Sequence, residues 1–158
     1  MSARVHATCV AIREMGVLLL GPSESGKSDL TLRLIDGGAM LVADDQVALA
    51  VEGGRLVASA PPHLPPLLEV RGVGLVPLPC RARVPLAVAF SLVPGGQPER
   101  LPEPAVWEHA GVRVPRYVLD PSAASAAARV RLLAERAPLA LEPQDSEAGL
   151  AVESPRRR

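Results

Sequence analysis

Residues 17–28 read VLLLGPSESGKS, an apolar run that leads directly into a loop rich in glycine and serine. A continuous apolar run of this kind indicates a strand that is covered on both faces. The residues that follow, 28–36, place their apolar side chains on one side of an amphipathic helix, which Gly37 ends. The order strand, loop and helix predicts an α/β domain built around this loop.

The loop fits the pattern G-x-x-x-x-G-K-[ST] of phosphate-binding loops at every fixed position. In such a P-loop, backbone N–H groups point at the phosphates of a nucleoside triphosphate, and the helix N-terminus adds positive potential. Gly26 permits close backbone approach, Lys27 supplies a cation for the β- and γ-phosphates, and Ser28 offers a hydroxyl to Mg²⁺. We therefore expect ATP to bind to Gly21, Pro22, Ser23, Glu24, Ser25, Gly26, Lys27 and Ser28.

A pair of carboxylates follows the next apolar stretch, Met40–Ala43, at Asp44 and Asp45. In P-loop proteins, an Asp at the end of such a strand organises Mg²⁺ and water. Adjacent residues at a strand end point in different directions, so one carboxylate could serve the metal while the other accepts the proton of a substrate hydroxyl. The alternative is an acidic turn before the next strand, and the P-loop upstream favours the functional interpretation.

Four further charged or titratable residues bear on the site, and these are Glu69, Arg71, Glu24 and His6. If the segment around Glu69 and Arg71 is a strand, the two side chains share one face, where the carboxylate stays ionised and can hold Mg²⁺. The alternative is an exposed ion pair of little energetic value. Glu24 places a negative charge in an anion-binding loop, so we expect its side chain to point outward or to face a metal or a basic group. His6 by itself favours a structural role.

The composition limits the partners of this chain. The sequence has 17 basic residues (Lys and Arg) and 17 acidic residues (Asp and Glu), so its formal net charge is +0. This balance argues against bulk DNA or an anionic membrane as a partner. Aromatic residues make up 2% of the sequence, which argues against a base-stacking platform. The apolar stretches are too short to span a bilayer. We expect a cytoplasmic protein with no nucleic-acid or membrane partner.

The chain of 158 residues suits one domain. We expect a catalytic domain over residues 1–142 and a disordered polar tail over 143–158. Within the domain, Ser122 is expected to cap a helix over 122–135. Apolar and β-branched runs predict strands over residues 5–12, 17–20, 40–43, 47–51, 56–58, 86–92 and 113–119. The strands over 47–51 and 56–58 are expected to form a hairpin around Gly53-Gly54.

In this order, the motifs resemble those of one family, the HPr kinase/phosphorylases. The matching text is Val5-His6-Ala7-Thr8, the P-loop, LVADD at 41–45, Ala60-Pro61 and LEVRGVG at 68–74. The resemblance implies an α/β fold in which the P-loop sits in a small mixed sheet, similar to phosphoenolpyruvate carboxykinase. It also implies an ATP-dependent serine kinase that acts on HPr, the small phosphocarrier of the bacterial sugar phosphotransferase system, and a homo-oligomer, which in this family is a hexamer.

The resemblance implies a role for each matching residue. Lys27 binds the phosphates, Ser28 and Glu69 hold Mg²⁺, and Asp44 accepts the proton of the substrate serine. His6 corresponds to the active-site histidine of the family. Asp45 and Arg71 correspond to supporting residues of the site. The expected catalytic set is therefore Asp44, Lys27, His6, Asp45 and Arg71.

Two departures from the family pattern shape the expectation. The motifs begin at His6, so we expect a short form without the family's N-terminal domain, similar to those of alphaproteobacteria. The family also carries an arginine in a late loop that supports dephosphorylation, whereas residues 119–124 read LDPSAA. This difference limits the expectation to the kinase reaction. The alternatives are a small-molecule kinase and an ATP-binding regulator without catalytic activity.

Overall fold

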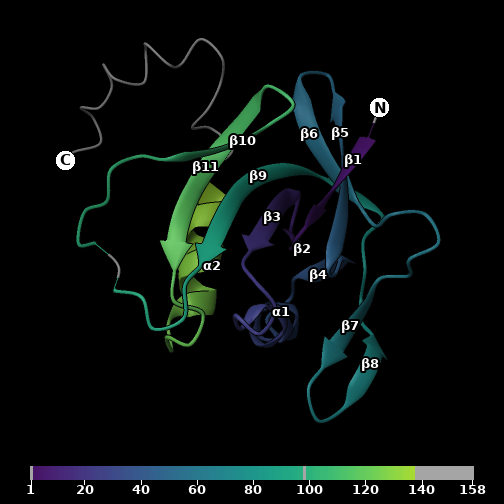
Figure 1. The fold of residues 1–158 in the computed structure, drawn as a ribbon, viewed down its shortest axis with the longest axis horizontal. Helices are drawn as coiled ribbons and strands as arrows, with labels where there is room; N and C mark the ends of the chain where they lie inside the picture. The colour runs from purple at the N-terminus through teal and green to yellow at the C-terminus, as the bar shows by residue number, and fades with distance from the viewer. Residues whose placement is uncertain (1, 98, 138–158) are drawn as a thin grey trace.

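The computed structural model describes residues 2–97 and 99–137, which form a mixed α/β fold with a strongly curled sheet (Figure 1). Two helices, α1 and α2, pack beside the strands. In chain order the elements are β1 Ser2–His6, β2 Thr8–Ile12, β3 Met15–Leu20, α1 Lys27–Asp36, β4 Met40–Ala43, β5 Gln46–Glu52, β6 Arg55–Ser59, β7 Leu67–Val70, β8 Gly74–Pro77, β9 Arg83–Leu92, β10 Val106–His109, β11 Val112–Leu119 and α2 Ala126–Arg136.

The described strands, apart from the hairpin β7–β8, form one nine-stranded sheet in the order β1-β5-β6-β9-β3-β2-β4, with β11 and β10 added at β9. Strand β9 is the junction. Its first residues pair antiparallel with β6, and its later residues run parallel to β3 on one side and to β11 on the other. The mixed sheet is therefore confirmed, and it is larger than the small sheet expected from the sequence.

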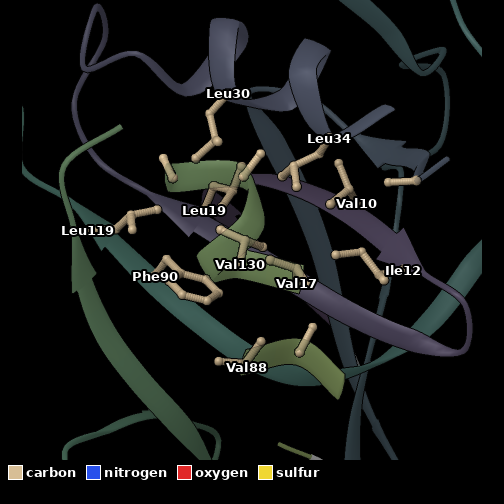
Figure 2. Close-up of a cluster of buried hydrophobic side chains, with 14 of the residues drawn as sticks. Val10, Ile12, Val17, Leu19, Leu30, Leu34, Val88, Phe90, Leu119 and Val130 are labelled. Atoms are coloured by element: carbon tan, nitrogen blue, oxygen red, sulfur yellow. The ribbon is translucent and has the colours of Figure 1, made fainter. Parts of the chain in front are cut away.

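The central strands β2, β3 and β9 are buried on both faces, and this divides the core in two. Along β2, Val10 and Ile12 belong to the core between the sheet and the helices, whereas Cys9 and Ala11 belong to the core on the opposite face. Strand β3 alternates in the same way, so its continuous apolar run is explained by burial on both faces, as expected. Figure 2 shows the helix-side core, with Val10, Ile12, Val17, Leu19, Leu30, Leu34, Val88, Phe90, Leu119 and Val130 labelled.

The single strand expected over residues 5–12 is wrong, because the chain breaks at Ala7. The Ala7 N–H donates to the carbonyl oxygen of Asp45 at 3.2 Å instead of continuing a ladder. Before the break, β1 pairs with β5, and after it β2 pairs with β3 and β4. Val5 before the break and Ala7 to Ile12 at and after it are apolar or β-branched, so the residue types alone did not reveal the change of partner.

The second helix begins later than expected. Its N-terminal flanking residue is Ser125, not Ser122. Ser122 instead belongs to a tight turn in which its N–H and its hydroxyl both donate to Oδ1 of Asp120, at 3.0 and 2.7 Å. The strand β10 was not expected, since the sequence before it is rich in proline. The hairpin β5–β6, in contrast, is confirmed.

The tail expected to be disordered, 143–158, lies outside the described residues. Neither α1 nor α2, the helices of the described part of the chain, has the length and apolar character needed to cross a bilayer.

We predict that Phe90→Ala lowers the free energy of unfolding by about 3–5 kcal/mol, because it leaves a cavity in the helix-side core. Phe90 is fully buried, and its ring lies 5.9 Å from that of Tyr117. Chemical denaturation followed by circular dichroism measures the effect. Val73→Ala is the control, since Val73 is 72% exposed and its truncation is expected to cost less than about 0.5 kcal/mol. Equal costs for both substitutions would contradict the packing described above.

Candidate active site

The loop between β3 and α1 is a tight turn that leads directly into the helix. Its turn closes through the Ser25 N–H, which donates to the carbonyl oxygen of Pro22 at 3.2 Å. Both Glu24 and Gly26 have positive φ, at 65° and 96°. Helix α1 begins directly afterwards at Lys27, and the N–H groups of its first turn have no partner within the helix. The unpaired N–H groups and the positive end of α1 therefore adjoin the loop.

The Lys27 side chain closes over this loop. Lys27 is 8% exposed, and its Nζ donates to the carbonyl oxygens of Gly21 and Pro22 at 2.6 and 2.9 Å. Burial lowers the pKa of the Lys27 ammonium, and the charges of Asp44 and Asp45 act in the opposite direction. The cation of the loop thus lies close to the acidic pair, although the two segments are separated in sequence.

Asp44 follows the last residue of β4 and is half-buried. Its Oδ1 accepts a hydrogen bond of 2.8 Å from the hydroxyl of Thr8 in β2. Burial raises the pKa of the Asp44 carboxyl, whereas the Thr8 hydroxyl and the backbone N–H of Glu69 act in the opposite direction. A carboxylate with a raised pKa holds a proton more readily at neutral pH than an exposed one, which suits a proton acceptor.

Asp45 points to a different neighbour. It has a positive φ of 71°, and its Oδ1 lies 3.2 Å from Nε2 of His6. Both side chains are exposed, at 72% and 51%, so this contact contributes little to stability. The two adjacent carboxylates therefore diverge, as expected, with one held in a partly buried hydrogen bond and the other near an exposed imidazole.

The hairpin β7–β8 brings a third group of charges to the loop. Leu68 is fully buried in the helix-side core and anchors β7 against α1. The expectation that Glu69 and Arg71 share one strand face is wrong, because β7 ends at Val70 and Arg71 lies in the turn. Arg71 instead lies 3.7 Å from the carboxylate of Glu24, so Glu24 faces a basic group.

The late segment around Pro121 packs beneath the loop. A Cβ atom added to Gly26 would lie 2.9 Å from Cγ of Pro121. Arg33 of α1 fixes the segment, because its guanidinium donates to the carbonyl oxygens of Pro121 and Ala123. A cavity of about 210 Å³ opens between these segments and is lined by Glu24, Ser25, Gly26, Asp29, Pro94, Pro121 and Ser122.

No group of three or more His, Cys, Asp or Glu side chains within residues 2–97 and 99–137 is arranged to hold a metal ion by itself. Mg²⁺ in nucleotide sites usually takes one or two protein ligands and completes its coordination with phosphates and water. The donor set here, with Ser28 in the first turn of α1 and Glu69 on β7, fits that arrangement.

The structure brings most of the sequence-predicted residues to one region. The acidic pair lies near the loop cation, His6 contacts Asp45, Arg71 contacts Glu24, and the Glu69 backbone lies beside Asp44. Two polar residues were not singled out from the sequence, Thr8 and Arg33. Thr8 could have been noticed as a hydroxyl residue within a run of buried apolar positions, whereas Arg33 has an ordinary place in an amphipathic helix.

Comparison with known proteins places these features in a family. The model of the HPr Serine kinase C-terminal domain matches residues 1–79. The HPr kinase/phosphorylase of Brevibacillus brevis is 44% identical over 73 residues, which are 46% of this chain and 24% of that protein. The HPr kinase/phosphorylase of Burkholderia lata is 42% identical over 110 residues, or 63% of this chain and 34% of that protein. The chain thus spans about a quarter to a third of these relatives.

A solved structure supports the same relationship. The Hpr(Ser) kinase/phosphatase from Coxiella burnetii superposes with a TM-score of 0.74 over 85% of this chain and 95% of that chain, at 26% sequence identity. The likeness extends beyond the segment matched by the family model, so it includes the second half of the described fold. Since the family model covers half of the sequence and the fold agrees, this chain belongs to the family of HPr serine kinase C-terminal domains.

Proposed function

We propose that this chain is an ATP-dependent kinase that phosphorylates a serine of an HPr-type phosphocarrier protein. The observation that carries the proposal is the half-buried carboxyl of Asp44, whose pKa is raised by burial and whose charge acts on Lys27 of the P-loop. A proton acceptor beside a phosphate-binding cation is what phosphoryl transfer to a hydroxyl requires. The names of the relatives, HPr kinase/phosphorylase, support the choice of substrate.

The P-loop supports ATP as the phosphoryl donor. In support of this, α1 begins at Lys27 directly after the loop, and the Lys27 ammonium lies against the loop at the carbonyl oxygens of Gly21 and Pro22. Ser28 and Glu69 would hold Mg²⁺, which neutralises charge on the phosphates when it is bound. We further propose that this site belongs to an arrangement of sheet and P-loop similar to that of phosphoenolpyruvate carboxykinase.

In the proposed reaction, the carboxylate of Asp44 accepts the proton from the serine hydroxyl of the substrate. The serine oxygen forms a bond to the γ-phosphorus as the bond between that phosphorus and the bridging oxygen of ADP breaks. Lys27 and the loop N–H groups stabilise the charge on the transferring group. The products are ADP, phosphoserine and a proton held by Asp44.

We propose the forward reaction alone. The late segment that packs against Gly26 contains Asp120, Pro121 and Ser122, and it has no arginine where the family places one. Asp120 accepts hydrogen bonds from the N–H groups of Gly95 and Ser122, so this segment supports the loop structurally. A cation at this position would be needed to polarise a phosphoserine for the reverse reaction.

We predict that Lys27→Ala and Asp44→Asn each reduce phosphoryl transfer to a purified HPr protein by at least about 100-fold, because they remove the phosphate cation and the proton acceptor. Incubation with Mg-ATP followed by mass spectrometry for phosphoserine measures the product. Asp36→Asn is the matched control for charge removal, since Asp36 is an exposed residue at the far end of α1.

Full activity in either Lys27→Ala or Asp44→Asn would overturn the proposed mechanism. Binding of ATP and HPr without any phosphoserine from the wild-type chain would identify a regulator without catalytic activity. Transfer of phosphate to a small molecule in a screen with labelled ATP, and not to HPr, would identify a small-molecule kinase.

We also predict that an acyl-phosphate derivative of ATP acylates Lys27 and that excess Mg-ATP prevents the reaction. Lys27 is the only lysine in the 158-residue sequence, so the N-terminal amine is the only other amine that the reagent can modify. The lowered pKa of Lys27 increases its neutral, reactive fraction. Peptide mass spectrometry locates the label, and labelling that Mg-ATP does not reduce would contradict nucleotide binding at the loop.

We predict that Gly26→Ala weakens ATP binding about tenfold or more, because an L-residue is strained at φ 96° and its Cβ would collide with Pro121. Isothermal titration calorimetry with Mg-ATP measures the dissociation constant. Gly38→Ala is the matched control, since Gly38 also has a positive φ of 113° but has no atom within 4 Å of an added Cβ. An unchanged dissociation constant in Gly26→Ala would contradict the role assigned to this backbone.

A further inference from the structure

Thr8 occupies an unusual place for a polar side chain. It is fully buried, and it is the first residue of β2, on the same side of the strand as the core residues Val10 and Ile12. The hydroxyl of a buried threonine must find an acceptor, since leaving it unpaired costs about 1–3 kcal/mol. Here the acceptor is a side-chain oxygen, Oδ1 of Asp44, at 2.8 Å.

Sheet register explains why these two residues meet. Strands β2 and β4 are antiparallel, and Cys9 pairs with Ala43 at the end of their ladder. Thr8 and Asp44 are the next residues on each side, so their side chains lie on one face at the point where β4 ends. The contact is therefore fixed by the backbone of two buried strands, although 36 residues separate the partners.

The hydrogen bond from Thr8 restrains the Asp44 carboxylate more firmly than the exposed contact with His6 restrains the Asp45 carboxylate. Threonine is branched at Cβ and has a restricted χ1, so the direction of its hydroxyl is well defined. Among the residues that the structure describes, the Thr8 hydroxyl is the one side-chain group that donates a hydrogen bond to the Asp44 carboxylate. Asp45, in comparison, faces an imidazole that is 51% exposed.

We infer that Thr8 is a positioning residue for phosphoryl transfer, in which its hydroxyl holds the Asp44 carboxylate in the orientation that accepts the proton of the substrate serine. The inference rests on the proposed function, because it requires Asp44 to be the proton acceptor. Without the hydroxyl, the carboxylate can rotate about its Cβ–Cγ bond, and misplacement of a reacting group by about 1 Å can cost on the order of 100-fold in rate.

The test compares Thr8→Val, which keeps the shape of the side chain and removes the donor, with Thr8→Ser, which keeps the donor. Steady-state kinetics use the full chain, Mg-ATP and a purified HPr protein. We expect Thr8→Val to lower kcat by about 10- to 100-fold with the KM for ATP changed less than about twofold, and Thr8→Ser to restore most of the loss.

Thr31→Val is the control for the loss of a buried threonine hydroxyl. Thr31 is also fully buried, but its hydroxyl donates to the backbone carbonyl oxygen of Lys27 within α1, at 2.6 Å, so kcat is expected to stay unchanged. Thermal denaturation of each variant reports its folding. If Thr8→Val does not fold, Thr8→Ser and Thr8→Ala are compared, since they differ only by the hydroxyl.

The outcomes separate the inference from the proposed function. A wild-type kcat in Thr8→Val, or equal kcat values in Thr8→Ser and Thr8→Ala, together with loss of activity in Asp44→Asn, overturns the positioning role and leaves the proposed function standing. Full activity in Asp44→Asn, or no phosphoserine from the wild-type chain, overturns both. A loss in Thr8→Val with no recovery in Thr8→Ser assigns the effect to packing and also overturns the inference.

Discussion

Strand β3 is buried on both faces, between the helices on one side and the second core on the other. It is also hydrogen-bonded along both edges, to β2 and to β9. A strand enclosed in this way cannot shift without disturbing close-packed neighbours. Its carboxyl end is therefore a fixed point, and the P-loop that leaves it begins from a defined position and direction. Under the proposed function, the burial of β3 thus sets where the phosphates of ATP would bind.

The segments next to β3 place the other candidate site residues at the same end of the sheet. Strand β2 pairs with β3 and β4, so Thr8 and Asp44 lie close to the loop that follows β3. The hairpin β7–β8 is not part of the main sheet, but Leu68 anchors it in the helix-side core. Charged side chains from separate segments therefore lie around one loop. Each segment is held in place by its own buried apolar residues.

Burial and hydrogen bonding act against each other at Asp44. Removal of water favours the protonated carboxyl, while donors from Thr8 and from the backbone favour the carboxylate. Burial has the larger effect, so the pKa is raised. Asp45, the next residue along the chain, is instead exposed to solvent. The difference between two adjacent aspartates is thus a consequence of where β4 ends in relation to the core.

Much of the fold and of the site followed from local sequence. The P-loop, its helix, the strand Met40–Ala43 and the hairpin around Gly53 depend on residues close together in the chain, so their patterns were readable. The break at Ala7 was not, because a change of strand partner leaves no mark on an apolar run. The start of α2 was misplaced because Ser122 bonds to Asp120 in a turn, a role that serine fills as readily as that of a helix cap.

The sequence by itself determined the loop that fits the phosphate-binding pattern, the acidic pair that follows it and the family to which they belong, since each depends on contiguous residues with fixed spacing. Only the tertiary structure decided which charges meet. It paired Arg71 with Glu24 and not with Glu69, since the chain turns after Val70. It also placed the Thr8 hydroxyl on Asp44, because strand register brings together residues that no local pattern connects.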